Sequence, residues 1–319
     1  QDASIQTFAS YVGVDGDVAV ITAGDKNHTV IFTGDLSTGA ATGTIIIDAD
    51  AGHDTDTLVQ VGGDITGVVT IDKNAGAVIL ELTGAGSTIN QSVDGVGDNE
   101  GTLKISGAGS TVTGKVGTTG TTSLAAIDVD ATATFDLTSE AAAYTVDADT
   151  TFTGAVLANT GTTIGTSGTD VIYTAASNTG ATALGASTTV TASSTLTTAA
   201  LTLAAGSTVT ANGIITTGDT TNTSGKTYLN VKDNVIDNII LVGTAELHVG
   251  DGFVSGDNIN TGSTADGDAN WASTSKIYLP SNLTSGETVT LTDSGEWDAT
   301  SGTAITTATA ITLTLQDTA

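Results

Sequence analysis

The sequence predicts an all-β protein, and within that class a parallel β-solenoid with a C-terminal β-rich capping or assembly module. The 319 residues include 66 threonines, 40 glycines and one proline, and 39% of them are hydrophobic although only 4% are aromatic. Threonine, valine and isoleucine favour strands. In addition, phrases of the sequence return at a nearly constant interval. We therefore expect mostly strand, around a core of thin layers of Val, Ile, Leu, Ala and Thr.

Two phrases show the repeat interval directly. TGTIIID at 42–48 returns as TGVVTID at 66–72, a shift that superposes Ile47 on Ile71. The further phrases of the series are LTGAGSTI at 82–89, ISGAGSTV at 105–112, AIDVD at 126–130 and LAAGSTVTANG at 203–213. The spacing slips between about residues 130 and 185. A period of about two dozen residues corresponds to one coil of a solenoid, in which neighbouring coils cover each other's apolar inward side.

The segment GTLKISGAGSTVTGKVGTTG at 101–120 shows how one coil is built. Apolar residues alternate with polar ones on both sides of a Gly-Ala-Gly corner. The predicted inward positions are Leu103, Ile105, Val112 and Val116. Thr111 and Thr113 are predicted to face outward or to form ladders between coils.

A tandem array of antiparallel β-sandwich domains is the alternative architecture, because it also has short strands separated by frequent turns. Repeats as short as these cannot enclose a core of their own, which favours the solenoid. The segment SEAAAYTVDA at 139–148 is the one candidate for a helical turn.

We expect two parts, a β-solenoid at residues 1–225 and a C-terminal β-rich module at residues 226–319. The second part holds both tryptophans and the single proline, and its apolar runs follow a looser period. The alternating segment at 309–316 is predicted to be a terminal strand that either closes its own domain or pairs with a neighbouring subunit. DVAVITAG at 17–24 is its candidate counterpart.

The charge of the chain excludes several classes of partner. Thirty-five acidic residues and seven lysines, with no arginine, give a net charge of -28. Such a surface repels phosphate backbones and anionic membranes, so we expect no nucleic-acid partner. The sequence has no run of eighteen apolar residues, so we expect no membrane insertion.

The chain contains no cysteine and no methionine. The missing cysteine excludes zinc–thiolate, iron–sulfur and thiol chemistry. Because the chain begins with Gln1, we expect a processed product or an excised piece of a longer protein. The repetitive, cysteine-free composition suits a secreted protein, located outside the cell or on its surface.

We expect no enzymatic activity. His28, His53 and His248 form no closely spaced pair, and the sequence has no P-loop, no nucleophile elbow and no dinucleotide-binding fingerprint. The β-helical polysaccharide lyases and hydrolases combine clustered Asp with Arg or Lys. That combination is hard to assemble from seven scattered lysines.

Three acidic phrases supply the candidate metal ligands. These are Asp48, Asp50, Asp54 and Asp56 in DADAGHDTD, Asp94, Asp98 and Glu100 in DGVGDNE, and Asp266 and Asp268 in STADGDAN. Clustered carboxylates repel one another unless a cation lies among them, and hard oxygen ligands select calcium. None of the phrases matches an EF-hand loop or a calcium-binding nonapeptide. Two interpretations stay open, a calcium site and solvated turn aspartates that cap backbone amides.

The run GTLKISGAGSTVTGKVGTTGTTSLAAIDVDATATFDL at 101–137 resembles the passenger repeats of bacterial surface autotransporters, especially the rickettsial outer-membrane protein B type, which forms an S-layer-like coat. SKIYLPSNLTSGETVTLTDSG at 275–295 is similar to phrases in the same passengers. The resemblance covers about a third of the chain, in motifs of low complexity. It implies a non-enzymatic β-solenoid on the outside of a Gram-negative cell, as a cleaved passenger or as a free, self-assembling subunit.

These observations predict an extracellular structural protein, a self-assembling subunit of a bacterial surface layer or filament. Its partner is then a second copy, held by β-edge pairing with calcium as a candidate link. The alternative is a cell-surface adhesin or glycan-binding passenger domain whose partner is a cell-surface polysaccharide. Ladders of Thr, Asn and Asp suit that role, and Trp271 or Trp297 can stack on sugar rings.

Overall fold

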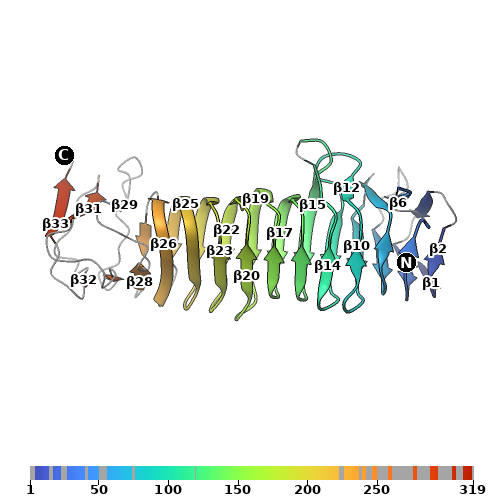
Figure 1. Ribbon diagram of the computed structural model, residues 1–319, viewed down its shortest axis with the longest axis horizontal. Helices are drawn as coiled ribbons and strands as arrows, with labels where there is room; N and C mark the ends of the chain where they lie inside the picture. The colour runs from blue at the N-terminus through green and yellow to red at the C-terminus, as the bar shows by residue number, and fades with distance from the viewer. Residues whose placement is uncertain are drawn as a thin grey trace. The chain divides into compact units, whose positions relative to one another are not determined.

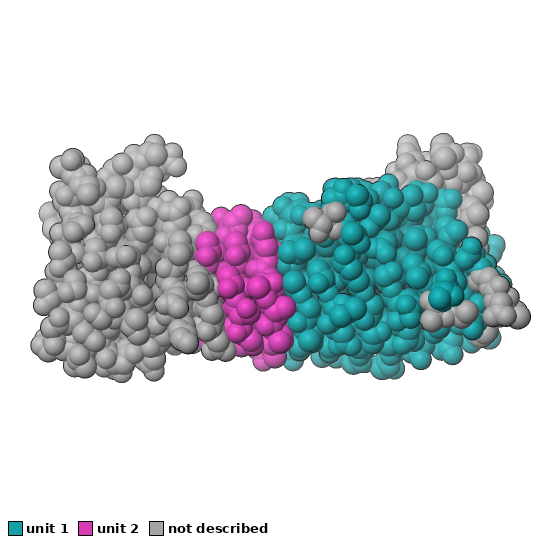
Figure 2. All heavy atoms as spheres, turned by 45° about the horizontal axis from the view of Figure 1, so that its top comes forward, with its two compact units in different colours: residues 1–161 teal, residues 162–319 magenta. Residues whose placement is uncertain are grey.

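The computed structural model is all-β, and no helix occurs among the residues that it describes. The described residues are 4–13, 17–22, 27–39, 42–49, 56–73, 76–118, 120–222, 226–236, 239–241, 246–249, 258–260, 276–278, 288–293, 304–306 and 312–317. Beyond Thr210 the description concerns the backbone, apart from a few side chains. The chain divides into two compact units, Gln1–Gly161 and Thr162–Ala319 (Figure 2).

Unit 1 is a parallel β-solenoid whose successive coils add strands to three columns (Figure 1). Column A consists of β1 (Ser4–Phe8), β4 (His28–Phe32), β7 (Thr57–Val61), β10 (Val78–Leu82), β13 (Thr102–Ile105), β15 (Leu124–Val129) and β17 (Ser139–Val146). Column B consists of β2 (Tyr11–Val12), β5 (Leu36–Ser37), β8 (Ile65–Thr66), β11 (Thr88–Ile89), β14 (Ser110–Val112), β16 (Ala133–Phe135) and β18 (Thr150–Phe152). Column C consists of β3 (Val18–Thr22), β6 (Thr44–Ala49), β9 (Val68–Lys73) and β12 (Val93–Gly95), and single bridges continue it from Val93 to Val116 and from Val116 to Ser139.

The core of unit 1 consists of straight rows of apolar side chains, because the parallel strands stack in register. In column A, for example, Val59, Leu80, Leu103 and Ile127 follow one another across four coils, and each is fully buried. The predicted inward positions Leu103, Ile105, Val112 and Val116 are all 0% exposed. Each coil therefore shields the apolar side of the next one.

The strand registers confirm the repeat interval predicted from the sequence. Ile47 lies opposite Ile71, Leu82 lies opposite Ile105, and Ile105 lies opposite Val129. Every pairing with a described register is parallel. The alternative of tandem antiparallel sandwiches is therefore wrong.

The slippage after residue 130 reflects a shorter coil. Thr102 lies opposite Ala126, and Ala126 lies opposite Ala143, so the second of these two steps spans a shorter stretch of chain than the first. In the longer coil, residues 117–123 separate Val116 from β15. In the shorter coil, Ser139 is itself the first residue of β17, so this loop is missing. The candidate helical turn at 139–148 is thus mostly strand.

Aromatic side chains occupy the core where the coil shortens. The rings of Phe135 and Phe152 stack at 5.0 Å between centroids, and Tyr144 meets Phe152 edge to face at 6.0 Å. All three are buried. The core therefore includes rings beside the Val, Ile, Leu, Ala and Thr expected from the composition.

Unit 2 also consists of parallel strands, and β19 (Val156–Ile164) contains the division between the units. Its other strands are β20 (Asp170–Tyr173), β21 (Ser177–Asn178), β22 (Ala181–Leu184), β23 (Thr189–Ala192), β24 (Leu196–Leu203), β25 (Thr208–Asn222), β26 (Lys226–Ile236), β27 (Ile239–Leu241), β28 (Glu246–Val249), β29 (Asn258–Asn260), β30 (Lys276–Tyr278), β31 (Thr288–Asp293), β32 (Ala304–Thr306) and β33 (Thr312–Asp317). Its first coils are equal in length, since Asp170 lies opposite Thr189 and Thr189 lies opposite Thr208.

The predicted boundary at 225/226 falls between two paired strands. β25 and β26 lie parallel along most of their length, with an irregularity between Ala211 and Ile214. Farther on the coils lengthen, because the steps from Glu246 to Lys276 and from there to Ala304 span more chain than the earlier steps of unit 2. These longer steps agree with the looser period noted in the sequence, and a separate C-terminal module stays a prediction.

Candidate functional site

The acidic phrase DGVGDNE begins within β12, which contains Asp94, and continues into a loop that lies beside a second loop preceding β15. Figure 1 shows loops rising above the coils beside these two strands. Within the first loop the Gly97 N–H donates a hydrogen bond to Glu100 Oε2 at 2.7 Å. The Ser123 hydroxyl of the second loop donates to Asp98 Oδ1, and Ser123 O accepts the Glu100 N–H at 3.1 Å. Asp98 and Glu100 thus brace the two loops against each other.

Asp94 is engaged separately from these two carboxylates. Its Oδ1 atom accepts hydrogen bonds from the hydroxyls of Thr118 and Thr122, each at 3.4 Å. Lys115 Nζ in turn donates to the Thr118 hydroxyl at 3.3 Å. The three carboxylates that the sequence groups together therefore bond to different donors in the structure.

A second acidic group, which the local sequence search missed, forms across coils. Asp48 of β6 lies opposite Asp72 of β9. Burial, and then repulsion from Asp48 and Glu100, raise the pKa of Asp72 above its ordinary value. We call Asp48, Asp72 and Glu100 the acidic row. It joins members of two separate acidic phrases, and the signal for it was present in the repeat, since TGTIIID and TGVVTID align Asp48 with Asp72.

Among the residues that the structure describes, no set of three or more His, Asp or Glu side chains is placed to hold a metal ion. Asp56 Oδ1 instead accepts the Ala77 N–H at 3.0 Å, and Asp56 Oδ2 accepts from Asn27 Nδ2 at 3.3 Å, as the turn-capping interpretation expects. The remaining candidates lie outside the described residues: Asp50, Asp54, Asp266 and Asp268. Calcium binding stays a prediction.

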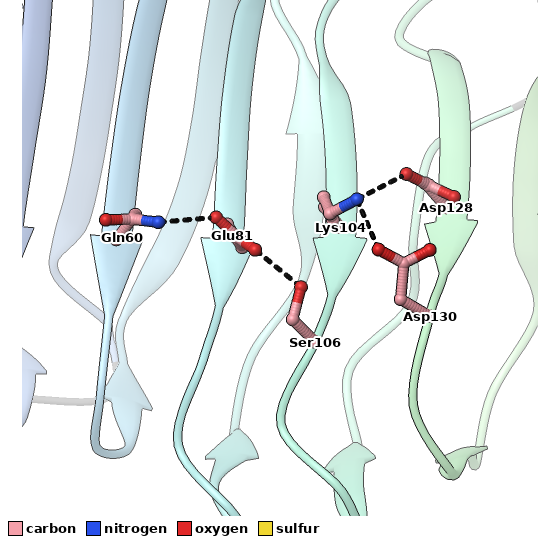
Figure 3. Close-up of polar contacts among 6 residues, drawn as sticks. All are labelled: Gln60, Glu81, Lys104, Ser106, Asp128 and Asp130. Carbon is pink, nitrogen blue, oxygen red and sulfur yellow. Dashed lines mark hydrogen bonds and ion pairs between the residues drawn. The ribbon is translucent and has the colours of Figure 1, made fainter. Parts of the chain in front are cut away.

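A further set of polar side chains follows the outward side of column A (Figure 3). Glu81 accepts hydrogen bonds from Gln60 Nε2, at 2.7 Å, and from the Ser106 hydroxyl. Because these residues come from neighbouring coils, their bonds tie three coils together on the surface.

Lys104 of β13 bonds to the coil that follows, since its Nζ lies 3.0 Å from Asp128 Oδ2 and 2.5 Å from Asp130 Oδ2 (Figure 3). The hydrogen bond with Asp130 raises the pKa of Lys104 above its ordinary value. The amine therefore stays protonated at neutral pH and is a poor nucleophile. Since 27% of the side chain is exposed, the ion pair is a surface feature of modest energy.

The histidines and tryptophans add little to the site. Nε2 of His28 is buried, and no hydrogen-bond partner for it occurs among the described groups. His53, Trp271 and Trp297 lie outside the described residues, and of His248 only the backbone is described.

The N-terminal edge of unit 1 is the most distinctive surface. β1 pairs with β4 on one side, and no described strand of the chain pairs with its other side. Ser4 N–H donates to Asn27 O and Phe8 O accepts from Thr33 N–H, so even-numbered residues of β1 bond toward β4. In a parallel pair the intervening residues then turn their N–H and C=O groups to the free edge. These residues are Ile5 and Thr7.

Large apolar side chains are exposed at this edge. Phe8 stacks on Phe32 at 5.4 Å between ring centroids but is 44% exposed, and Tyr11 is 45% exposed. Their neighbours in the next coil, Phe32 and Leu36, are buried at 5% and 0%. Ile5, on the outward side, is 66% exposed. The first coil thus presents the end of the apolar core.

The fold and this edge together define the chain as a parallel β-solenoid repeat protein. Such a fold is compatible with the passenger-like repeats that the sequence resembles. No protein-family model, no curated protein and no solved structure matches the chain. In the described part, no helix is long and apolar enough to cross a membrane.

Proposed function

We propose that this chain is a non-enzymatic structural protein of the bacterial cell exterior, a self-assembling subunit of a surface layer or filament. The observation that carries the proposal is the free edge of β1. Unpaired strand edges bind further strands, and natural proteins usually block them with charged residues, proline or bulges. β1 (SIQTF) and β2 (YV) contain no charged residue and no proline.

The charge of the chain sets the conditions for assembly. A net charge of -28 keeps copies apart at low ionic strength. Salt screens this repulsion within about 10 Å at 0.1 M and about 3 Å at 1 M. Assembly by edge pairing is therefore expected to strengthen with salt, and calcium is expected to act in the same direction.

The test blocks the free edge without disturbing the pairing of β1 with β4. Thr7→Pro removes an N–H that faces the free edge, a position where an edge strand tolerates proline. Thr7→Val keeps this N–H and is the matched control. Sedimentation velocity and electron microscopy, in a salt series with and without calcium, are expected to show polymers of the wild type and of Thr7→Val. The concentration needed for assembly is expected to rise at least tenfold in Thr7→Pro.

Circular dichroism spectra and melting temperatures check that all three chains fold. Wild-type chain that stays monodisperse in every condition would contradict the proposal. So would polymers that form equally well from folded Thr7→Pro, because the edge of β1 would then be irrelevant.

A polysaccharide-binding adhesin is the second candidate, and one feature favours it. Thr88, Thr111, Thr134 and Thr151 follow one another in register across four coils of column B, which agrees with the predicted ladders. In the described part of the chain, these four hydroxyls make no hydrogen bond to another protein group. We call them the threonine row. An array of this kind can bind the hydroxyls of an extended neutral glycan repeatedly.

The threonine row can be tested by replacing its four residues with valine, which keeps the β-branched shape and removes the hydroxyl groups. The matched control carries four outward-facing Thr→Val changes on other sides of the coils: Thr29, Thr70, Thr102 and Thr145. Pull-down with insoluble cellulose, chitin and mannan is the readout. If wild type and both variants bind alike, or if none binds, the threonine row is not a glycan site.

A further inference from the structure

The outward side of column A carries a group of aliphatic side chains. Residues that alternate with the buried positions of β1, β4, β7 and β10 point outward, and four of them are aliphatic: Ile5, Ile31, Leu58 and Ile79. Leu58 lies opposite Ile79, and Ile31 stands diagonal to both Ile5 and Leu58. Ile5 is 66% exposed and the other three are partly exposed. Apolar side chains that gather on one exposed side mark a contact surface.

An uncharged row extends this surface from β1 to β17. Its members stand in register on successive coils: Ile5, Thr29, Leu58, Ile79, Thr102, Ala126 and Ala143. The second outward row of column A carries charge only from β10 onward, and this charge is bonded within the same copy. Glu81 accepts hydrogen bonds from Gln60 and Ser106. Lys104 lies against Asp128 (Figure 3).

Charge favours this side of the coils for contact between two copies. A net charge of -28 makes copies repel each other. In the second and third coils, column C presents Asp48 and Asp72, and the exposed Asp35 and Asp64 precede strands β5 and β8 of column B. The column A strands β1, β4 and β7 contain no Asp, Glu or Lys. Contact through column B or C therefore sets carboxylates against carboxylates, whereas contact through column A buries aliphatic side chains.

The size of this face determines how strongly two copies hold each other. Column A has seven strands in unit 1. With a spacing of about 4.8 Å between strands and a width of about five residues, the face covers about 500 Å² per copy. A stable complex buries about 800 Å² per partner. Two free copies therefore form only a short-lived pair, but many such contacts act together when the copies are already aligned in polymers.

From these observations we infer that filaments associate in pairs, with the outward face of column A in one copy packed on the same face of a second copy. Two sheets packed in this way lie about 10 Å apart. The contact is isologous, because both copies use the same surface, and it closes after two filaments. This inference rests on the proposed function, since the free edge of β1 forms the filament and the column A face then joins two filaments.

The test adds charge to the column A face and leaves the edge of β1 intact. Leu58→Glu/Thr102→Glu puts two carboxylates on the uncharged row, two coils apart. Thr88→Glu/Thr134→Glu is the matched control, because it puts the same charges on column B at the same spacing. Leu58→Thr/Ile79→Thr removes apolar surface without adding charge, in case the carboxylates impair folding. Circular dichroism compares the folding of the full-length chains, and electron microscopy then measures filament width at a salt concentration where the wild type polymerises.

Most of the filament length of the wild type and of the column B control is expected to be paired. In both column A variants the paired fraction is expected to fall at least fivefold, while single filaments still form. Single filaments of the wild type at every salt concentration, or equal pairing in the folded column A variants, would overturn the inference and leave the proposed function standing. Folded column A variants that form no filaments would also overturn it, because the face would then be needed for the filament itself. If the wild type forms no filaments in any condition, the inference and the proposed function both fail.

Discussion

The Gly-Ala-Gly corner of the repeat predicts that two glycines separated by a single alanine differ in how well they tolerate substitution. A Cβ atom added to Gly107 would lie 2.0 Å from the carbonyl oxygen of Gly84, one coil away. A Cβ atom added to Gly109 would meet nothing within 4 Å, but Gly109 has a φ of 75°. Gly107 is therefore required for the close approach of two coils, and Gly109 for its left-handed backbone.

The magnitudes follow from these two causes. To admit alanine at Gly107, the coils must separate at the corner by more than about 1 Å, which weakens the bond from the Gly107 N–H to Leu82 O, now 2.9 Å. A lost hydrogen bond costs about 1 kcal/mol and overpacking about 1–3 kcal/mol, so Gly107→Ala is expected to cost about 2–4 kcal/mol. Gly109→Ala is expected to cost about 1–2 kcal/mol, the ordinary penalty of a left-handed non-glycine residue.

The assay is urea unfolding followed by far-UV circular dichroism, with both variants beside the wild type. The preceding coil supplies an independent repeat of the comparison. A Cβ atom on Gly84 would lie 2.1 Å from Gly62 O, whereas one on Gly86 would meet nothing. The reasoning is refuted if Gly107→Ala and Gly84→Ala cost no more than Gly109→Ala and Gly86→Ala.

Three further predictions concern charged groups. Asp72→Asn is expected to raise the melting temperature near neutral pH. Because folding raises the pKa of Asp72, the folded chain binds the Asp72 proton more tightly than the unfolded chain does, and the wild type loses stability as the pH rises through the pKa of the folded state. Melting temperatures measured at decreasing pH should show the wild type and Asp72→Asn converging below the ordinary pKa of aspartate. Lys104→Gln should lower the free energy of unfolding in urea by less than about 1 kcal/mol, and the loss should be smaller at high salt than at low salt. An equal loss at both salt concentrations would contradict a surface ion pair. If the DGVGDNE loop binds calcium, calcium should raise the melting temperature of the wild type more than that of Glu100→Gln, and the absence of any calcium shift would end that interpretation.

The sequence predicted the coil stack well, because in-register parallel pairing converts a sequence shift directly into a spatial neighbour. The alignment of Ile47 with Ile71 and of Leu82 with Ile105 became cross-strand pairs. The short step from Ala126 to Ala143 was not predicted. The alternation of apolar residues predicts which side chains point inward, but it does not predict how many loop residues lie between two strands.

The acidic row was missed for a related reason. The ligand candidates that the sequence offers, as in DGVGDNE, are neighbours along the chain, whereas a solenoid places residues one repeat apart side by side. Asp48 and Asp72 stand one repeat apart and lie opposite each other. The carboxylates of DGVGDNE, in contrast, are neighbours in sequence but have different partners. Asp94 accepts hydrogen bonds from Thr118 and Thr122, and Asp98 accepts one from Ser123. The edge of β1 was anticipated only in general terms, since exposure of Phe8 follows from the position of the coil and not from its sequence.

The three columns of unit 1 differ in how regularly they continue from coil to coil. Columns A and B contribute a strand in every coil of unit 1, whereas column C narrows to single bridges after β12. Both braced loops lie between column C of one coil and column A of the next. The coil also shortens at this place, because the second loop is missing before β17. Loops that can change length without disturbing the inward rows are where binding specificity usually arises, and the acidic row lies beside them. The edge of β1, in contrast, keeps the strand geometry to which we propose that a second copy pairs. Under the proposed function, assembly is therefore tested by mutation at Thr7, and a response to calcium is tested separately at Glu100.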